Sequence, residues 1–79
     1  MEEIVKYIVD KLVDNKEAVV ISSEEKGDDV TIKVLVAKDD MGKVIGRNGK
    51  VAQSIRAIIK TASNGTNKRY FVKFDEKAE

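Results

Sequence analysis

The residues whose types and spacing most clearly suggest a chemistry lie in the segment 41–50, Met-Gly-Lys-Val-Ile-Gly-Arg-Asn-Gly-Lys. Gly46 and Gly49 bracket a GxxG turn, in which glycine lets the backbone bend sharply and expose its N–H groups. A helix that starts directly after the turn adds unpaired N–H groups and a partial positive charge. Arg47 and Lys50 add full positive charges at the same place. The segment is therefore predicted to bind a phosphate group.

Charged residues are unevenly distributed, although the net charge is only +1. Residues 1–40 hold eleven acids and six lysines, whereas residues 41–74 hold eight bases and no acid. A basic stretch of this length predicts a polyanionic partner such as a nucleic acid. A basic face that is simply solvated is the plainer alternative. The eight bases are Lys43, Arg47, Lys50, Arg56, Lys60, Lys68, Arg69 and Lys73.

The composition argues against most enzyme classes. The chain has no histidine and no cysteine, so it lacks the commonest general base, the commonest metal ligand and any thiol or disulfide. Paired carboxylates fall in predicted caps and turns, where no apolar cleft is implied that would shift their pKa values. We therefore predict no enzymatic activity, no catalytic residue, no cofactor and no metal.

The glycine stretch does not fit the loops that bind nucleotide phosphates. A Walker A loop needs Gly where Val44 stands and Ser or Thr where Val51 stands. A dinucleotide fingerprint also fails, because Gly42, Gly46 and Gly49 are spaced GxxxGxxG. A bare GxxG is a weak signal by itself, since it also occurs as a plain tight turn between two helices. That structural interpretation stays open.

A chain of 79 residues is expected to form one domain. We place this domain at residues 1–75, followed by a frayed acidic tail at residues 76–79. The apolar runs are far shorter than the ~20 residues needed to span a bilayer. The start, Met-Glu-Glu, lacks the basic-then-apolar layout of a signal peptide. A soluble, cytoplasmic protein without a membrane partner is the expectation.

Hydrophobic periodicity predicts the elements of the first half. A helix is expected over residues 2–14 and a strand over residues 18–21. Alternating apolar residues predict a second strand over residues 30–36, antiparallel to the first. The polar turn between the strands is interpreted as a solubilising loop tip rather than a metal site. The apolar stripe of the helix is Ile4, Val5, Ile8, Leu12 and Val13, and the acids of the turn are Glu24, Glu25, Asp28 and Asp29.

The second half is predicted to hold two helices and a strand. Asp39 or Asp40 caps a short helix over residues 41–45, which ends at the first glycine of the turn. A longer helix follows over residues 49–63, and a strand over residues 70–74. The stripe of the longer helix is Val51, Ala52, Ile55, Ile58, Ile59 and Ala62. This order predicts a two-layer α+β domain with three helices on one face of a three-stranded sheet.

The motif and the element order resemble a known family. Residues 44–50, Val-Ile-Gly-Arg-Asn-Gly-Lys, resemble the VIGxxGK signature of KH domains, and the element order resembles the type II arrangement αββααβ. The segments 12–15, 17–19 and 40–46 are similar to small bacterial single-KH proteins of the KhpA family. The resemblance covers residues 1 to about 74. Lys16 departs from it, because many members have Pro there, and this affects only the junction between helix and strand.

The resemblance implies an RNA-binding protein that acts as an RNA chaperone. It also implies a KH-containing partner of the KhpB type, or a homodimer, and a link to cell-wall synthesis, cell shape and cell length. In KH domains the GxxG loop clamps the backbone of four nucleotides.

We expect single-stranded RNA to lie between the GxxG turn with its two helices and the strand at residues 30–36. Stacking is expected to be minor, because no aromatic residue lies near the loop. The alternatives are a dimerising protein–protein adaptor with a purely structural turn, or a single-stranded DNA binder, since backbone contacts do not read the 2′-OH. The expected RNA-binding residues are Lys43, Gly46, Arg47, Asn48, Gly49 and Lys50, and the expected groove floor is Ile45, Val51 and Ile55.

Overall fold

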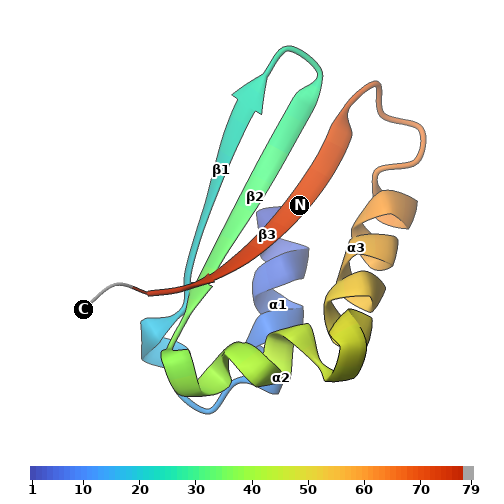
Figure 1. Cartoon of the computed structure of the whole chain (residues 1–79). Helices are drawn as coiled ribbons and strands as arrows, with labels where there is room; N and C mark the ends of the chain where they lie inside the picture. Colours follow the sequence, from blue (N-terminus) through green and yellow to red (C-terminus); the bar gives the residue numbers. More distant parts are fainter. Residues whose placement is uncertain (78–79) are drawn as a thin grey trace.

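The computed structural model describes residues 1–77 and shows three helices on one face of a three-stranded sheet (Figure 1). The predicted two-layer α+β architecture is confirmed, and short 3₁₀ turns (η) are added to it. The elements in chain order are α1 (Glu2–Leu12), η1 (Lys16–Ala18), β1 (Val20–Lys26), β2 (Asp29–Val36), η2 (Lys38–Asp40), α2 (Met41–Ile45), η3 (Arg47–Gly49), α3 (Lys50–Ala62) and β3 (Arg69–Glu76).

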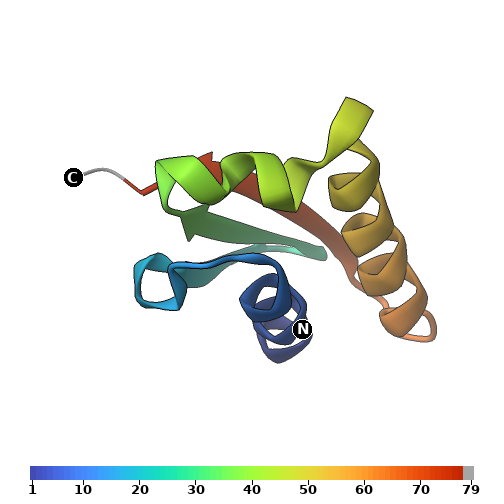
Figure 2. The ribbon, with the colours of Figure 1, turned by 90° about the horizontal axis from the view of Figure 1, so that it is seen from below.

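The sheet has the order β1-β2-β3, so β2 is its central strand. β1 and β2 form the predicted antiparallel hairpin, in which Ser22 lies opposite Lys33. β3 runs parallel to β2, with Val72 beside Ile32. Parallel pairing needs a long crossover, which α2 and α3 provide. β3 is an edge strand, and the loop of residues 63–68 connects it to the end of α3 (Figure 2).

The hairpin strands are longer than the hydrophobic pattern predicts. β1 extends to Lys26, so Glu24 and Glu25 lie within a strand and not in a loop at the tip. Polar side chains do not prevent pairing, because backbone groups form the ladder and β1 is an exposed edge strand. Only two residues separate the strands, and one of them, Gly27, has a φ of 58°, as a tight hairpin turn requires.

The core lies between the sheet and the helices. Val5 and Val9 of α1 are fully buried, whereas Ile4 is 38% exposed. The predicted stripe of α1 is therefore partly wrong, because its centre is the line of Val5, Val9 and Val13 at four-residue spacing. The remaining buried members of the core are Val30, Ile32, Val34, Val36, Val44, Ile59 and Val72.

The stripe of α3 is also narrower than predicted. Ala52, Ile55 and Ile59 are buried, but Ile58 is 47% exposed. Successive residues of a helix are about 100° apart around its axis, so Ile58 and Ile59 do not face the sheet together. Ile58 instead belongs to an apolar patch on the outer side of α3.

Asp40 stands at the predicted N-cap of α2, but its side chain does not cap that helix. Its carboxylate accepts backbone N–H groups from Asp14 at 3.2 Å and Asn15 at 3.0 Å. These donors lie just beyond the end of α1, and Asp40 satisfies them in a buried position with 2% of its surface exposed. The contact joins the end of α1 to the start of α2. The GxxG turn follows the end of α2.

β3 is longer at both ends than the strand predicted over residues 70–74. Glu76, assigned to the frayed tail from the sequence, is the last residue of this strand. The Lys77 N–H donates to the Val36 carbonyl at 2.8 Å, so backbone bonding to β2 continues through the described residues. The last two residues of the predicted tail, 78 and 79, lie outside the described residues.

Candidate nucleic-acid interface

The segment between α2 and α3 is the single turn η3, which projects from the body of the molecule (upper right in Figure 2). The Gly46 N–H closes α2 by donating to the Gly42 carbonyl at 2.9 Å. Gly46, Asn48 and Gly49 have φ values of 77°, 57° and 74°. Positive φ is costly for most residues, readily adopted by glycine and tolerated by asparagine. The residue types of the motif are therefore those that this backbone requires.

Gly46 is also required by its close approach to α3. A Cβ at this position would lie 2.8 Å from the Val51 Cβ and 2.9 Å from the Val51 nitrogen. Gly49, by contrast, has open space where a Cβ would be. The turn is thus packed against the start of α3 at its first glycine and open at its second.

Two cations stand on this turn without a counter-ion. Arg47 and Lys50 are exposed, and neither forms an ion pair within residues 1–77. α3 begins at Lys50 and has no acid in its first turn. The Gly49 and Lys50 N–H groups donate to the Gly46 and Arg47 carbonyls within the turn, and the dipole of α3 adds positive potential beside the two side chains. This arrangement can hold an anion such as a phosphate.

Lys43 differs from these two cations. Its ammonium forms ion pairs with Asp14 and, at 3.3 Å, with Asp40. The hydrogen bond to Asp14, with a further one to Asp40, raises the pKa of Lys43 above its ordinary value. Two carboxylates therefore balance its charge, and the side chain is held between α2 and the end of α1. The structure places Lys43 in a cluster with Asp14 and Asp40, whereas Arg47 and Lys50 have no ion-pair partner among residues 1–77.

The expected groove floor is only partly at the surface. Ile45 and Val51, which flank the turn, are half-buried and present apolar surface. Ile55 is only 2% exposed, so its side chain is buried and offers almost no surface to a ligand.

The strand at the sheet edge beside α3 is β3, and not the strand that was expected to face the bound RNA. β2 is paired on both sides, whereas β3 is the edge strand beside α3. The groove described next is bordered by β3 at residues 69–73, whereas the expectation placed residues 30–36 beside the bound RNA. A local hydrophobic pattern identifies strands, but it does not give their order in the sheet.

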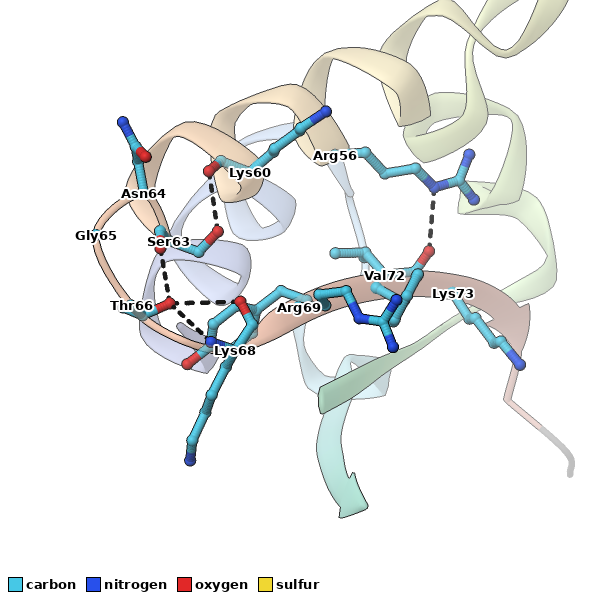
Figure 3. Close-up of a pocket in the computed structure, with 12 residues that line it drawn as sticks. Arg56, Lys60, Ser63, Asn64, Gly65, Thr66, Lys68, Arg69, Val72 and Lys73 are labelled. Carbon is cyan, nitrogen blue, oxygen red and sulfur yellow. Dashed lines mark hydrogen bonds between the residues drawn. The ribbon is translucent and has the colours of Figure 1, made fainter. Parts of the chain in front are cut away.

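A groove of about 700 Å³ lies between the C-terminal half of α3, the loop that follows it and β3 (Figure 3). Its lining includes five bases and no acid, and the sequence analysis counted these bases without placing them together. The only signal in the sequence was the acid-free stretch 41–74, which also contains the turn. The five bases are Arg56, Lys60, Lys68, Arg69 and Lys73.

The five basic residues of this groove differ in their hydrogen bonds and ion pairs. The Arg56 Nε donates to the Val72 carbonyl at 3.1 Å and so bridges α3 and β3 (Figure 3). Lys68 and Arg69 form ion pairs with acids of the hairpin, Glu25 and Asp29. Lys60 and Lys73 form no ion pair within the described part of the chain. They are the groove cations available to an external anion.

The order αββααβ, with a GxxG turn between α2 and α3, defines a KH domain of the type II arrangement. A family model described as the KhpA/KhpB KH domain matches residues 2–74. An RNA-binding protein KhpA of Listeria monocytogenes is 42% identical over 69 residues, which cover 87% of this chain and 91% of that protein. An RNA-binding protein KhpA of Caldanaerobacter subterraneus subsp. tengcongensis is 43% identical over 72 residues, covering 91% and 96%. The chain belongs to the KhpA/KhpB KH domain family.

No solved structure matches the chain. None of the helices within residues 1–77 is both long and apolar enough to cross a membrane. The same residues contain no group of three or more acidic side chains placed to hold a metal ion.

Proposed function

We propose that this protein binds single-stranded RNA and holds its backbone at the Gly46–Gly49 turn. The observation that carries the proposal is the pair of cations, Arg47 and Lys50, which form no ion pair within residues 1–77 and lie at the N-terminal end of α3. RNA is the ligand class favoured by the names of the relatives from Listeria and Caldanaerobacter. The proposed role is binding and not catalysis.

In the proposed complex, phosphates contact the exposed turn at Arg47 and Asn48. Arg47 and Lys50 supply charge, and the bases rest on the half-buried Ile45 and Val51. The RNA then follows the groove between α3 and β3, where Lys60 and Lys73 form no ion pair within residues 1–77. Contacts of this kind position a backbone without reading base edges, so sequence preference should be weak. A few phosphate contacts predict a dissociation constant of roughly 10⁻⁴–10⁻⁶ M.

Membership of the family supports a finer proposal, in which the protein is a cytoplasmic RNA chaperone with a KhpB-type partner or a second copy. Either partner would raise the weak affinity of one domain through avidity. The patch of Ala57, Ile58, Thr61 and Ala62 on α3 is the surface that such a partner would cover. We further propose a contribution to cell-wall synthesis and cell length, which a deletion strain would test by its cell dimensions.

Two other functions remain to be separated from this one. A dimerising adaptor would use the GxxG turn only as a structural element, with its basic segment docked on an acidic protein. A single-stranded DNA binder would use the same phosphate contacts, which do not involve the 2′-OH.

Salt-titrated binding to single-stranded RNA, single-stranded DNA and duplex RNA separates these functions. The proposal predicts binding that weakens steeply with salt and favours the RNA single strand over the duplex. Equal affinity for the two single strands would support the DNA alternative. An absence of binding to all three at low salt would contradict the proposal and favour the adaptor.

A further inference from the structure

The face of the sheet that the helices do not cover carries its own cluster of basic and aromatic side chains. Alternate residues of the strands point away from the core, and Lys33, Lys73 and Phe71 share this outer face. Their neighbours Ile32, Val34 and Val72 are buried on the helix side. The outer cluster is therefore separate from the GxxG turn, which lies between two helices.

Lys33 and Lys73 are direct neighbours across the parallel pair of β2 and β3. Like charges in that position destabilise a sheet, and neither lysine has an ion pair within residues 1–77. The fold does not need this pair, because any polar residue would serve on an exposed face. Two unbalanced cations side by side are suited to binding an anion.

The lysines border a hollow of about 510 Å³ on the outer face. Ser22 and Thr31 add hydroxyl groups to its lining, which are hydrogen-bond donors for phosphate oxygens. Two acids, Glu24 and Asp75, also line it. Glu24 lies 3.8 Å from the Lys26 ammonium, which partly balances its charge.

Phe71 adds a surface on which a base can stack. It precedes Lys73 by two residues, so both lie on the same face of β3, and its side chain is 47% exposed. An exposed aromatic ring on a sheet beside cations is how several proteins hold single-stranded nucleic acids. Phe71 and Lys73 also line the groove between α3 and β3, so the edge of β3 joins that groove to the outer face.

We propose that single-stranded RNA leaving this groove crosses the edge of β3 and makes a second contact on the outer face of the sheet. A phosphate lies between Lys33 and Lys73, and a base stacks on Phe71. This inference rests on the proposed RNA binding and extends it from the four nucleotides of a GxxG clamp to a longer strand.

The test is the Lys33→Glu variant, because Lys33 lines the outer hollow and not the groove of α3 and β3. The change removes the repulsion with Lys73, so the variant should fold. Binding is measured for RNAs of about 4 and about 16 nucleotides across a range of salt concentrations. The longer RNA should bind roughly ten-fold more weakly to the variant, with a salt slope reduced by about 0.7, and the shorter RNA should bind unchanged.

Lys16→Glu on η1 is the matched control, since it makes the same charge change outside the cluster. Equal losses in the two variants, or a change in oligomeric state without a change in RNA binding, would overturn the inference. If the wild-type protein binds neither RNA, the proposed function itself is wrong, whatever the effect of the Lys33 variant. If a change in the GxxG turn abolishes binding while Lys33→Glu has no effect, only the second contact is excluded.

Discussion

Gly46 shows how one residue sets the geometry of the turn. Its φ of 77° is unfavourable for other residues, and a Cβ there would collide with Val51 of α3. Gly46→Ala should therefore lower the free energy of unfolding by about 2 kcal/mol or more. Urea denaturation measures the change.

Gly42→Ala is the natural control for this substitution. Gly42 lies inside α2, and nothing stands within 4 Å of the position its Cβ would take. Alanine should stabilise that helix by about 0.5–1 kcal/mol. Equal destabilisation by the two substitutions would contradict the packing described for Gly46.

Asp40 predicts a dependence of stability on pH. Its pKa is lowered mainly by the hydrogen bond from the Asn15 N–H, with burial opposing and further lowering by Asp14 and Lys43. A carboxyl whose pKa is lower in the folded chain stabilises the fold above its ordinary value of 3.8. This contribution is lost as the pH falls through the folded-state value.

Asp40→Asn should accordingly unfold at a lower urea concentration than wild type at neutral pH. The difference between the two proteins should shrink as the pH falls well below 3.8, because wild-type Asp40 then becomes protonated. Urea midpoints at several pH values test this. A difference that stays constant over the whole range would show that the charge of Asp40 does not matter.

At the residue scale, the sequence predicted the cations Arg47 and Lys50 at the turn, but it did not predict the ion pairs of Lys43 with Asp14 and Asp40. Arg47 and Lys50 are identified by their places in and after a GxxG motif. The partner of Lys43, Asp14, stands 29 residues away in the chain, and no local pattern links the two. The spacing between Asp40 and Lys43 permits a contact, but the burial of Asp40 depends on where α1 ends.

At the element scale, α3 carries the clearest contrast between inner and outer faces. Ile59 is 1% exposed and belongs to the core, whereas its neighbour Ile58 is 47% exposed. Ile59→Ala should cost about 2–5 kcal/mol of unfolding free energy, and Ile58→Ala about 0.5 kcal/mol or less at protein concentrations where the chain is monomeric. Urea denaturation of both variants tests which face α3 buries, and similar costs would contradict it.

The sequence predicted the type and order of the elements but not their arrangement in the sheet. Periodicity identifies α3 and β2 because each has a regular apolar pattern. β1 was predicted too short, since its second half is polar and lacks an apolar pattern. The position of β3 at the edge depends on the crossover through α2 and α3. The sequence analysis therefore did not predict the groove beside β3, although it counted the basic residues that line this groove.

At the scale of the whole molecule, the acidic and basic halves of the sequence do not form two separate surfaces. Lys68 and Arg69 pair with Glu25 and Asp29 of the hairpin, and Lys43 pairs with Asp14. The cations that stay unpaired among residues 1–77 include Arg47 and Lys50 on the turn and Lys60 and Lys73 beside β3. The fold thus uses part of the charge asymmetry internally and leaves the remainder for a ligand.

The central claim, that the turn holds an RNA backbone, is tested by the affinity of the Arg47→Asp, Asn48→Asp double variant for single-stranded RNA. Aspartate tolerates the positive φ of position 48, and both side chains are exposed, so the variant should fold. Asn15→Asp with Lys16→Asp makes the same charge change at η1. The account predicts at least a ten-fold loss of affinity, roughly, in the turn variant alone. A folded turn variant with wild-type affinity would contradict it.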